Sequence, residues 1–187
     1  MKNIKSKEEI IVALTKEDGK WKITENNISY YAVQGIWAMY GNVNKEWECL
    51  EVGETGMELG ISAELTANIK MICNSNDANL VACEGAKGFK IYKTDSTFPR
   101  YGKRRVSKYI DISKNYGSIK VFYIGGFTDL QIRKNKEAEY AMDHQAKYWY
   151  VGRGQGKFVK EYLEKAEHKS WVKDRVGKFK HMASHNT

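Results

Sequence analysis

The chain has 187 residues, of which 31 are Lys or Arg and 23 are Asp or Glu, so its formal net charge is +8. This length suits one domain with a real hydrophobic core, and the basic balance, with a pI of about 9.2, favours a polyanionic partner such as nucleic acid over an acidic one. The three cysteines are scattered and include no C-x-x-C pair, which argues against a disulfide framework. The histidines lack metal-ligand spacing with them, which argues against a structural zinc site. The apolar stretch near the N-terminus is too short for a signal peptide or a membrane span, so we expect a cytoplasmic protein with no membrane partner.

The first third of the chain predicts a helix followed by a hairpin. Ser6 to Leu14 fits a short helix, with Ser6 as the N-cap and two glutamates in the first turn. Residues 28–40 are rich in Tyr, Val, Ile and Trp, which is the composition of a strand, and residues 47–52 form the expected antiparallel partner after a polar connection.

The middle third predicts two helices around a smaller hairpin. From 59 to 73 apolar residues recur at the helical period, whereas 80–83 and 89–92 are short apolar runs broken by glycines and fit a second hairpin. After Pro99 a basic run opens a short helix, with one face traced by Val106, Tyr109, Ile110 and Ser113.

The last third contains the clearest strand. Residues 118–124 are apolar and flanked by glycines, so they should be central in the sheet. Thr128 or Asp129 can cap a further helix that extends to Lys147. Residues 157–180 are dominated by Lys and Glu, with aromatic and aliphatic residues at helical spacing, and predict one or two terminal helices.

Taken together, these elements predict an α+β fold with a small, mostly antiparallel central sheet flanked by helices. We expect a single domain over residues 1–187, with a core at about 28–150 that contains an insertion at about 54–98. Residues 157–187 form a basic helical extension in this interpretation. There is no internal repeat and no low-complexity linker, which favours one unit over two tethered domains.

Two glycine-containing segments on the predicted hairpin suggest a function. Gly35-Ile36-Trp37 and Glu51-Val52-Gly53 together resemble the paired signature of the GIY-YIG endonuclease superfamily. Trp37 stands where that family has its first tyrosine, and Glu51 stands where it has the second. The resemblance implies a metal-dependent endonuclease, of a restriction or mobile-element type. In such enzymes a strand tyrosine helps deprotonate water, a helical arginine holds the phosphate and a glutamate on a later helix carries one divalent metal.

The implied roles can be assigned to candidate residues. Arg104 or Arg105 would hold the phosphate, because guanidinium offers a rigid fork to phosphate oxygens. Glu137 or Glu139 would bind Mg²⁺ or Mn²⁺, and their facing on a helix differs by about 200 degrees, so only one of them can point at the site. An indole offers only an N–H donor, so a nearby phenol would have to replace Trp37 as the base. The local phenols are those of Tyr30, Tyr31 and Tyr40.

Duplex DNA is the favoured partner in this interpretation. The basic residues expected to contact it are Arg100, Lys103, Lys108, Arg153 and Lys157. The alternative is a non-catalytic nucleic-acid-binding or host-interaction protein on a nuclease-like scaffold, and Trp37 in the tyrosine position favours it. A metal nuclease of another fold, using Glu48, Glu51 and Glu54, ranks lower because the expected following lysine is absent.

Overall fold

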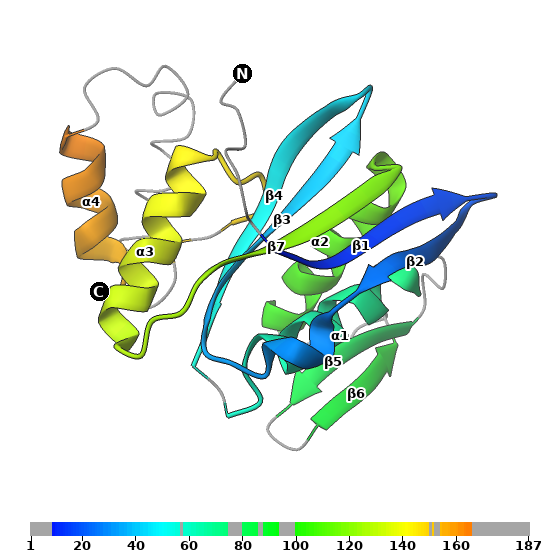
Figure 1. The fold of residues 1–187 in the computed structure, drawn as a ribbon, viewed down its shortest axis with the longest axis horizontal. Helices are drawn as coiled ribbons and strands as arrows, with labels where there is room; N and C mark the ends of the chain where they lie inside the picture. Colours follow the sequence, from blue (N-terminus) through cyan, green and yellow to red (C-terminus); the bar gives the residue numbers. More distant parts are fainter. Residues whose placement is uncertain are drawn as a thin grey trace.

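The computed structural model describes residues 9–56, 58–74, 80–85, 88–93, 100–149, 151 and 154–165, with the backbone alone for 80–85, 88–93 and 100–107. Figure 1 shows its elements in chain order. These are β1 (Ile10–Glu17), β2 (Lys20–Asn26), the 3₁₀ helix η1 (Ile28–Tyr31), β3 (Gly35–Val43), β4 (Glu46–Thr55), α1 (Gly60–Cys73), β5 (Leu80–Gly85), β6 (Gly88–Lys93), α2 (Arg100–Asn115), β7 (Ser118–Gly125), α3 (Leu130–Asp143) and α4 (Gly156–Lys165).

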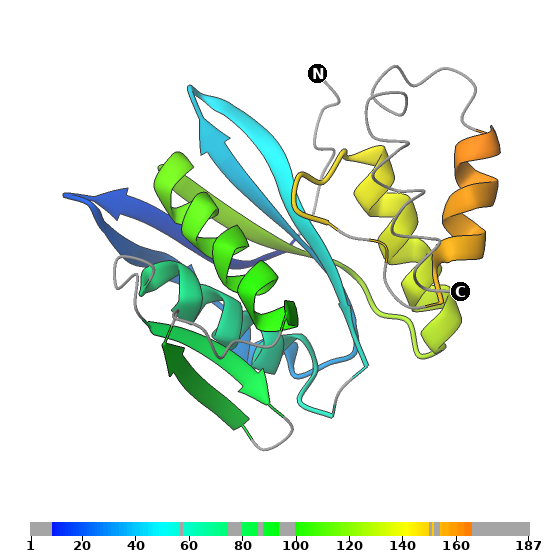
Figure 2. The ribbon, with the colours of Figure 1, turned by 180° about the vertical axis from the view of Figure 1, so that it is seen from behind.

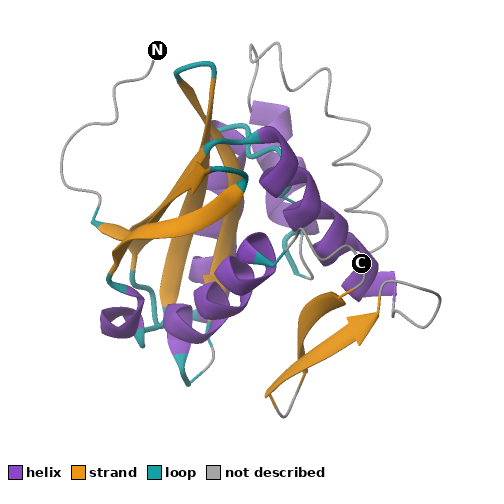
Figure 3. Cartoon of the chain, turned by 90° about the vertical axis from the view of Figure 1, so that its right-hand side faces the viewer, coloured by secondary structure: helices purple, strands orange, loops and turns teal. Residues whose placement is uncertain are grey.

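The main sheet has five antiparallel strands in the order β2-β1-β7-β3-β4. The predicted α+β fold with an antiparallel sheet is therefore confirmed, and the strand predicted to be central, now β7, lies in the middle of the order. β5 and β6 pair only with each other and form a small hairpin away from the main sheet (Figure 3). This hairpin and α1 occupy the part of the chain predicted to be an insertion.

Each face of the main sheet has its own hydrophobic core. Because successive side chains of a strand point to opposite faces, Trp37 and Met39 of β3 join a core with α1 and α2, whereas Ile36 and Ala38 join a second core with α3 and α4. Figure 2 shows α1 and α2 covering the first face, and Figures 1 and 2 both show α3 and α4 beside β3 and β4. The sheet therefore separates α2 from α3.

Two predicted elements near the N-terminus are wrong. The structure has strand β1 where a helix was expected over Ser6 to Leu14, and this strand lies between β2 and β7 in the sheet. The sheet pairing of Val12 with Val121 overrides the local helical signals. The strand predicted from residue 28 begins only at Gly35, because Ile28–Tyr31 forms the 3₁₀ helix.

Most later predictions are confirmed with shifted ends. The helix predicted to extend to Lys147 ends at Asp143, and Asp129 is its N-cap, since the Asp129 carboxylate accepts a 2.7 Å hydrogen bond from the Ile132 N–H. Tyr109 and Ser113 lie on the buried face of α2 as predicted, whereas Ile112 is buried there and Ile110 is only half-buried.

Candidate functional site

The two glycine segments lie side by side, as predicted, in the motif hairpin formed by β3 and β4. Trp37 pairs with Gly53 across the two strands. A Cβ atom on Gly53 would lie 2.4 Å from the Trp37 ring, so Gly53 must lack a side chain because the indole lies against its backbone. The Trp37 side chain is fully buried, and its Nε1–H donates to Glu64 of α1 at 3.2 Å. The position of the family's first tyrosine is therefore occupied by a packed indole with its donor satisfied.

Glu51, which stands where the resemblance implies the second tyrosine, has a buried carboxylate. Glu51 is 9% exposed and accepts a 2.9 Å hydrogen bond from the Tyr109 hydroxyl. It also forms a buried ion pair with Lys108, whose side chain is 11% exposed. Lys108 was predicted to contact nucleic acid. In the structure it attaches α2 to β4, because a buried carboxylate needs a charged partner.

The three candidate tyrosines lie in three different environments. Tyr40 points toward α3, where its hydroxyl lies 3.0 Å from the Tyr140 hydroxyl and 2.9 Å from His144 Nδ1. Tyr31 belongs to the opposite core and donates to Glu9 at 2.8 Å; burial and this carboxylate raise the pKa of Tyr31 to about 12, which makes it a poorer source of phenolate. Tyr30 is 80% exposed. These phenols therefore do not surround one point.

The helices that carry the predicted phosphate and metal ligands lie on opposite faces of the sheet. Arg104 and Arg105 are in α2, which packs with α1, and their side chains are outside the described residues. Glu137 is in α3 on the other face, and Glu139 forms a surface ion pair with Lys136 at 2.7 Å.

Glu137 itself is committed to a structural contact. Its two carboxyl oxygens accept hydrogen bonds from Trp149 Nε1 at 2.9 Å and from Gln155 Nε2 at 2.6 Å. Burial, together with the charges of Glu54 and Glu64, raises the pKa of Glu137 to about 8, although the two hydrogen bonds act in the opposite direction. Both carboxyl oxygens of Glu137 are thus occupied by contacts with the segment between α3 and α4.

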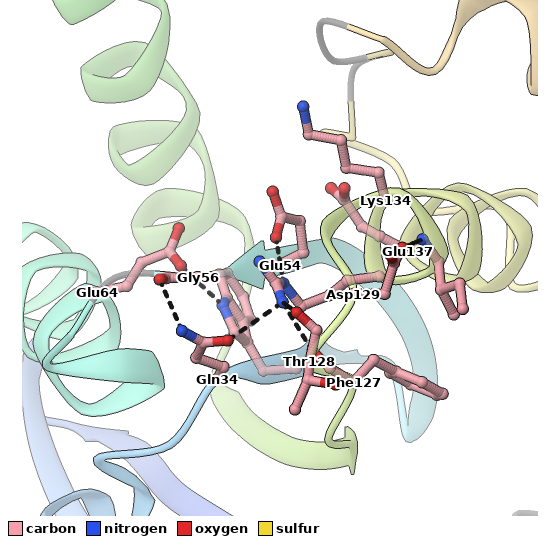
Figure 4. A network of polar contacts seen from close by, with 12 residues as sticks. Gln34, Glu54, Gly56, Glu64, Phe127, Thr128, Asp129, Lys134 and Glu137 are labelled. Carbon is pink, nitrogen blue, oxygen red and sulfur yellow. Dashed lines mark hydrogen bonds and ion pairs between the residues drawn. The ribbon is translucent and has the colours of Figure 1, made fainter.

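A residue that the sequence analysis missed connects α3 to the motif hairpin. Arg133 is 3% exposed, and its guanidinium bonds to the loop before α3 and to the end of β4. Figure 4 shows the labelled partners Gln34, Glu54 and Thr128 close together in this polar network. Its Nε–H donates to Glu54 at 2.8 Å, and one terminal nitrogen donates to the backbone carbonyls of Phe127 at 2.7 Å and Thr128 at 3.2 Å. The same nitrogen lies 3.4 Å from the Gln34 side-chain oxygen.

The backbone around Arg133 is shaped to receive it. A Cβ on Gly56 would lie 2.2 Å from a guanidinium nitrogen, and the Gly56 carbonyl accepts a 3.0 Å hydrogen bond from Gln34. Arg133 is one helical turn before Glu137, and that i, i+4 spacing was the sequence signal that could have found it. The resemblance implies that a metal-binding carboxylate from the later helix lies near the glycine segments. In the structure, the side chain of α3 that reaches them is the guanidinium of Arg133.

The other predicted nucleic-acid contacts are only partly described. Lys157 is exposed on α4. Arg100 and Lys103 open α2, with side chains outside the described residues, and Arg153 also lies outside them. Within the described part of the chain, no group of three or more His, Cys, Asp or Glu side chains could hold a metal ion, and Mg²⁺ stays a prediction.

None of the described helices is both long and apolar enough to cross a membrane.

Comparisons with protein-family models, with curated proteins and with solved structures find no match for this chain.

Proposed function

We propose that this protein binds nucleic acid on a nuclease-like scaffold and does not cleave it through the tyrosine, arginine and glutamate chemistry of the GIY-YIG family. The observation that carries the proposal is Arg133, a buried cation bonded to Glu54 at the end of the motif hairpin. Because Arg133 already neutralises Glu54, that carboxylate is not available to a divalent metal ion.

The other two key positions support the same proposal. A general base must accept a proton, and the Trp37 indole offers only an N–H donor. Glu51 already neutralises Lys108 inside the protein. Trp37 and Glu51 therefore have structural contacts at the two positions where the family resemblance implies catalytic tyrosines.

The charge distribution supports a polyanionic partner. The net charge is +8, and exposed lysines occur on several elements. The first turn of α2 contains no acidic residue, and residues 100–105 include four Lys or Arg and no Asp or Glu. Cations at a helix N-terminus are unfavourable to the helix itself, and a bound phosphate would offset them.

Nucleic-acid binding and cleavage can be tested together with the full chain. Fluorescence anisotropy with labelled DNA and RNA should show binding that weakens steeply as NaCl rises, with equal affinity in EDTA and in Mg²⁺. Gels of the same mixtures should show intact nucleic acid in Mg²⁺ and in Mn²⁺. Failure to bind DNA or RNA at low salt would disprove the proposal.

Metal-dependent endonuclease activity is the second candidate function, and one observation favours it. β7, β3 and β4 are adjacent, the two glycine segments pair, and the basic helix α2 and then α3 follow in the order that the resemblance implies. Cleavage of duplex DNA in Mg²⁺ or Mn²⁺, lost in Glu137→Ala or Glu139→Ala, would establish this candidate in place of the first.

A further inference from the structure

One row of side chains crosses the whole main sheet on the face that carries α3. Cross-strand pairs join neighbouring strands in turn, from β2 through β1, β7 and β3 to β4. The row consists of Lys22, Thr15, Ser118, Asn42 and Trp47. Strands lie about 4.8 Å apart, so the row is about 19 Å long.

The row lies beyond the part of this face that α3 covers. Its cross-strand neighbours toward α3 are buried, since Ala13, Tyr40 and Cys49 are each less than 9% exposed. In contrast, Trp47 is 38% exposed and the Lys22 side chain is 63% exposed. In Figures 1 and 2, α3 and α4 lie beside β3 and β4, and β1 and β2 lie at the far end of the sheet.

The row offers hydroxyl, amide and ammonium hydrogen-bond donors and one aromatic ring, that of Trp47. None of the hydrogen bonds between described side chains involves Thr15, Ser118 or Asn42. Lys22 makes a surface ion pair with Glu17, which contributes little to stability. Lys120, two residues after Ser118 along β7 and on the same face, lies 5.0 Å from the centre of the Trp47 ring.

We propose that this row binds single-stranded nucleic acid, with an unpaired base stacked on Trp47 and the adjacent phosphates contacted by Lys120 and the hydroxyl and amide groups. The inference rests on the proposed function and names its substrate class and surface. Aromatic platforms flanked by lysine suit single strands, because every base has a face to stack, whereas the bases of a duplex are already stacked on one another.

Two matched pairs of variants test the surface. Val43 is 37% exposed in the same hairpin as Trp47, and as the neighbour of Asn42 along β3 it points to the opposite face. Lys114 is exposed on α2, which also lies on the opposite face. Trp47→Ala is therefore compared with Val43→Ala, and Lys120→Gln with Lys114→Gln, by anisotropy with labelled oligothymidine and oligouridine.

The expected result is specific to one face. Trp47→Ala should weaken single-strand binding about five- to 150-fold, which is the usual effect of losing one stacked base, whereas Trp47→Phe keeps most of the affinity. Lys120→Gln should also weaken binding more than Lys114→Gln, and a duplex of equal length should bind less tightly than either single strand. Circular dichroism confirms that each variant is folded.

Three outcomes would overturn the inference. If the variants of each pair bind alike, the row is not the surface, although nucleic-acid binding itself would stand. If duplex DNA or an acidic peptide binds as tightly as the single strands and ignores Trp47→Ala, then charge alone drives association. If the unmodified chain binds no nucleic acid, the proposed function fails as well.

Discussion

Arg133 is the residue whose removal should damage this fold most clearly. The side chain is 3% exposed, and its partner Glu54 is 18% exposed. Removing one member of a buried ion pair leaves the other charge uncompensated and costs about 3 to 5 kcal/mol. Because the Glu54 carboxylate keeps some contact with water, we expect Arg133→Met to reduce the free energy of unfolding by about 3 kcal/mol, at the lower end of that range.

Urea denaturation followed by tryptophan fluorescence measures this loss, provided that the slope of free energy against urea is unchanged. Lys136→Met is the matched control on the same helix, since the Lys136–Glu139 pair has side chains 52% and 40% exposed. An exposed pair contributes about 0 to 1 kcal/mol, so the control should be nearly neutral.

A double-mutant cycle separates the ion pair from the loss of packing. Glu54→Gln removes the uncompensated charge, so adding it to Arg133→Met should restore part of the lost stability and give a coupling energy of about 1 to 3 kcal/mol. Equal stabilities of Arg133→Met and Lys136→Met, or additive effects in the cycle, would show that the buried pair does not stabilise the fold in this way. Arg133 would then be available for another role at the end of the motif hairpin.

Three further perturbations test the neighbouring contacts. The pKa of Glu137 is about 8 in the folded protein and 4.5 in a free side chain, so between these pH values the folded state binds a proton that the unfolded state does not. The stability of the unmodified protein relative to Glu137→Gln should therefore fall as pH rises from 4.5 to 8, which urea midpoints across that range would show. Gly53→Ala should cost about 1 to 3 kcal/mol by forcing a methyl against Trp37, and thermal melts should show a smaller cost in a Trp37→Phe background, where the ring is smaller. Lys108→Met should cost about 3 kcal/mol by leaving Glu51 without its cation, while the salt slope of nucleic-acid binding stays unchanged.

Each of these three has a matched control. Glu139→Gln changes an exposed carboxyl on the same helix and should show no comparable pH dependence. Gly117→Ala places a methyl where no atom lies within 4 Å, so it should be neutral or slightly stabilising. Lys114→Met removes an exposed lysine from the same helix as Lys108. Effects as large in the controls as in the test variants would contradict the corresponding assignment.

Elements whose signals are local could be predicted from the amino-acid sequence. The hairpin of β3 and β4, the helix α1 and the central strand β7 follow from periodicity and turn residues within each segment. The pairing of Trp37 with Gly53 does not follow from the connection alone, because the register of β3 against β4 shifts by one residue between Met39 and Tyr40.

The faces that these elements share are set by contacts between distant segments. β1 is a strand because Val12 pairs with Val121, more than a hundred residues away, and no local pattern contains that partner. The same holds for the candidate site, where a long arginine side chain from α3 reaches Glu54, and Glu137 turns to Trp149 and Gln155. Long side chains and packed helix faces take their positions only when the whole chain has folded, and the folded chain places α2 and α3, which carry the predicted arginines and glutamates, on opposite faces of the sheet.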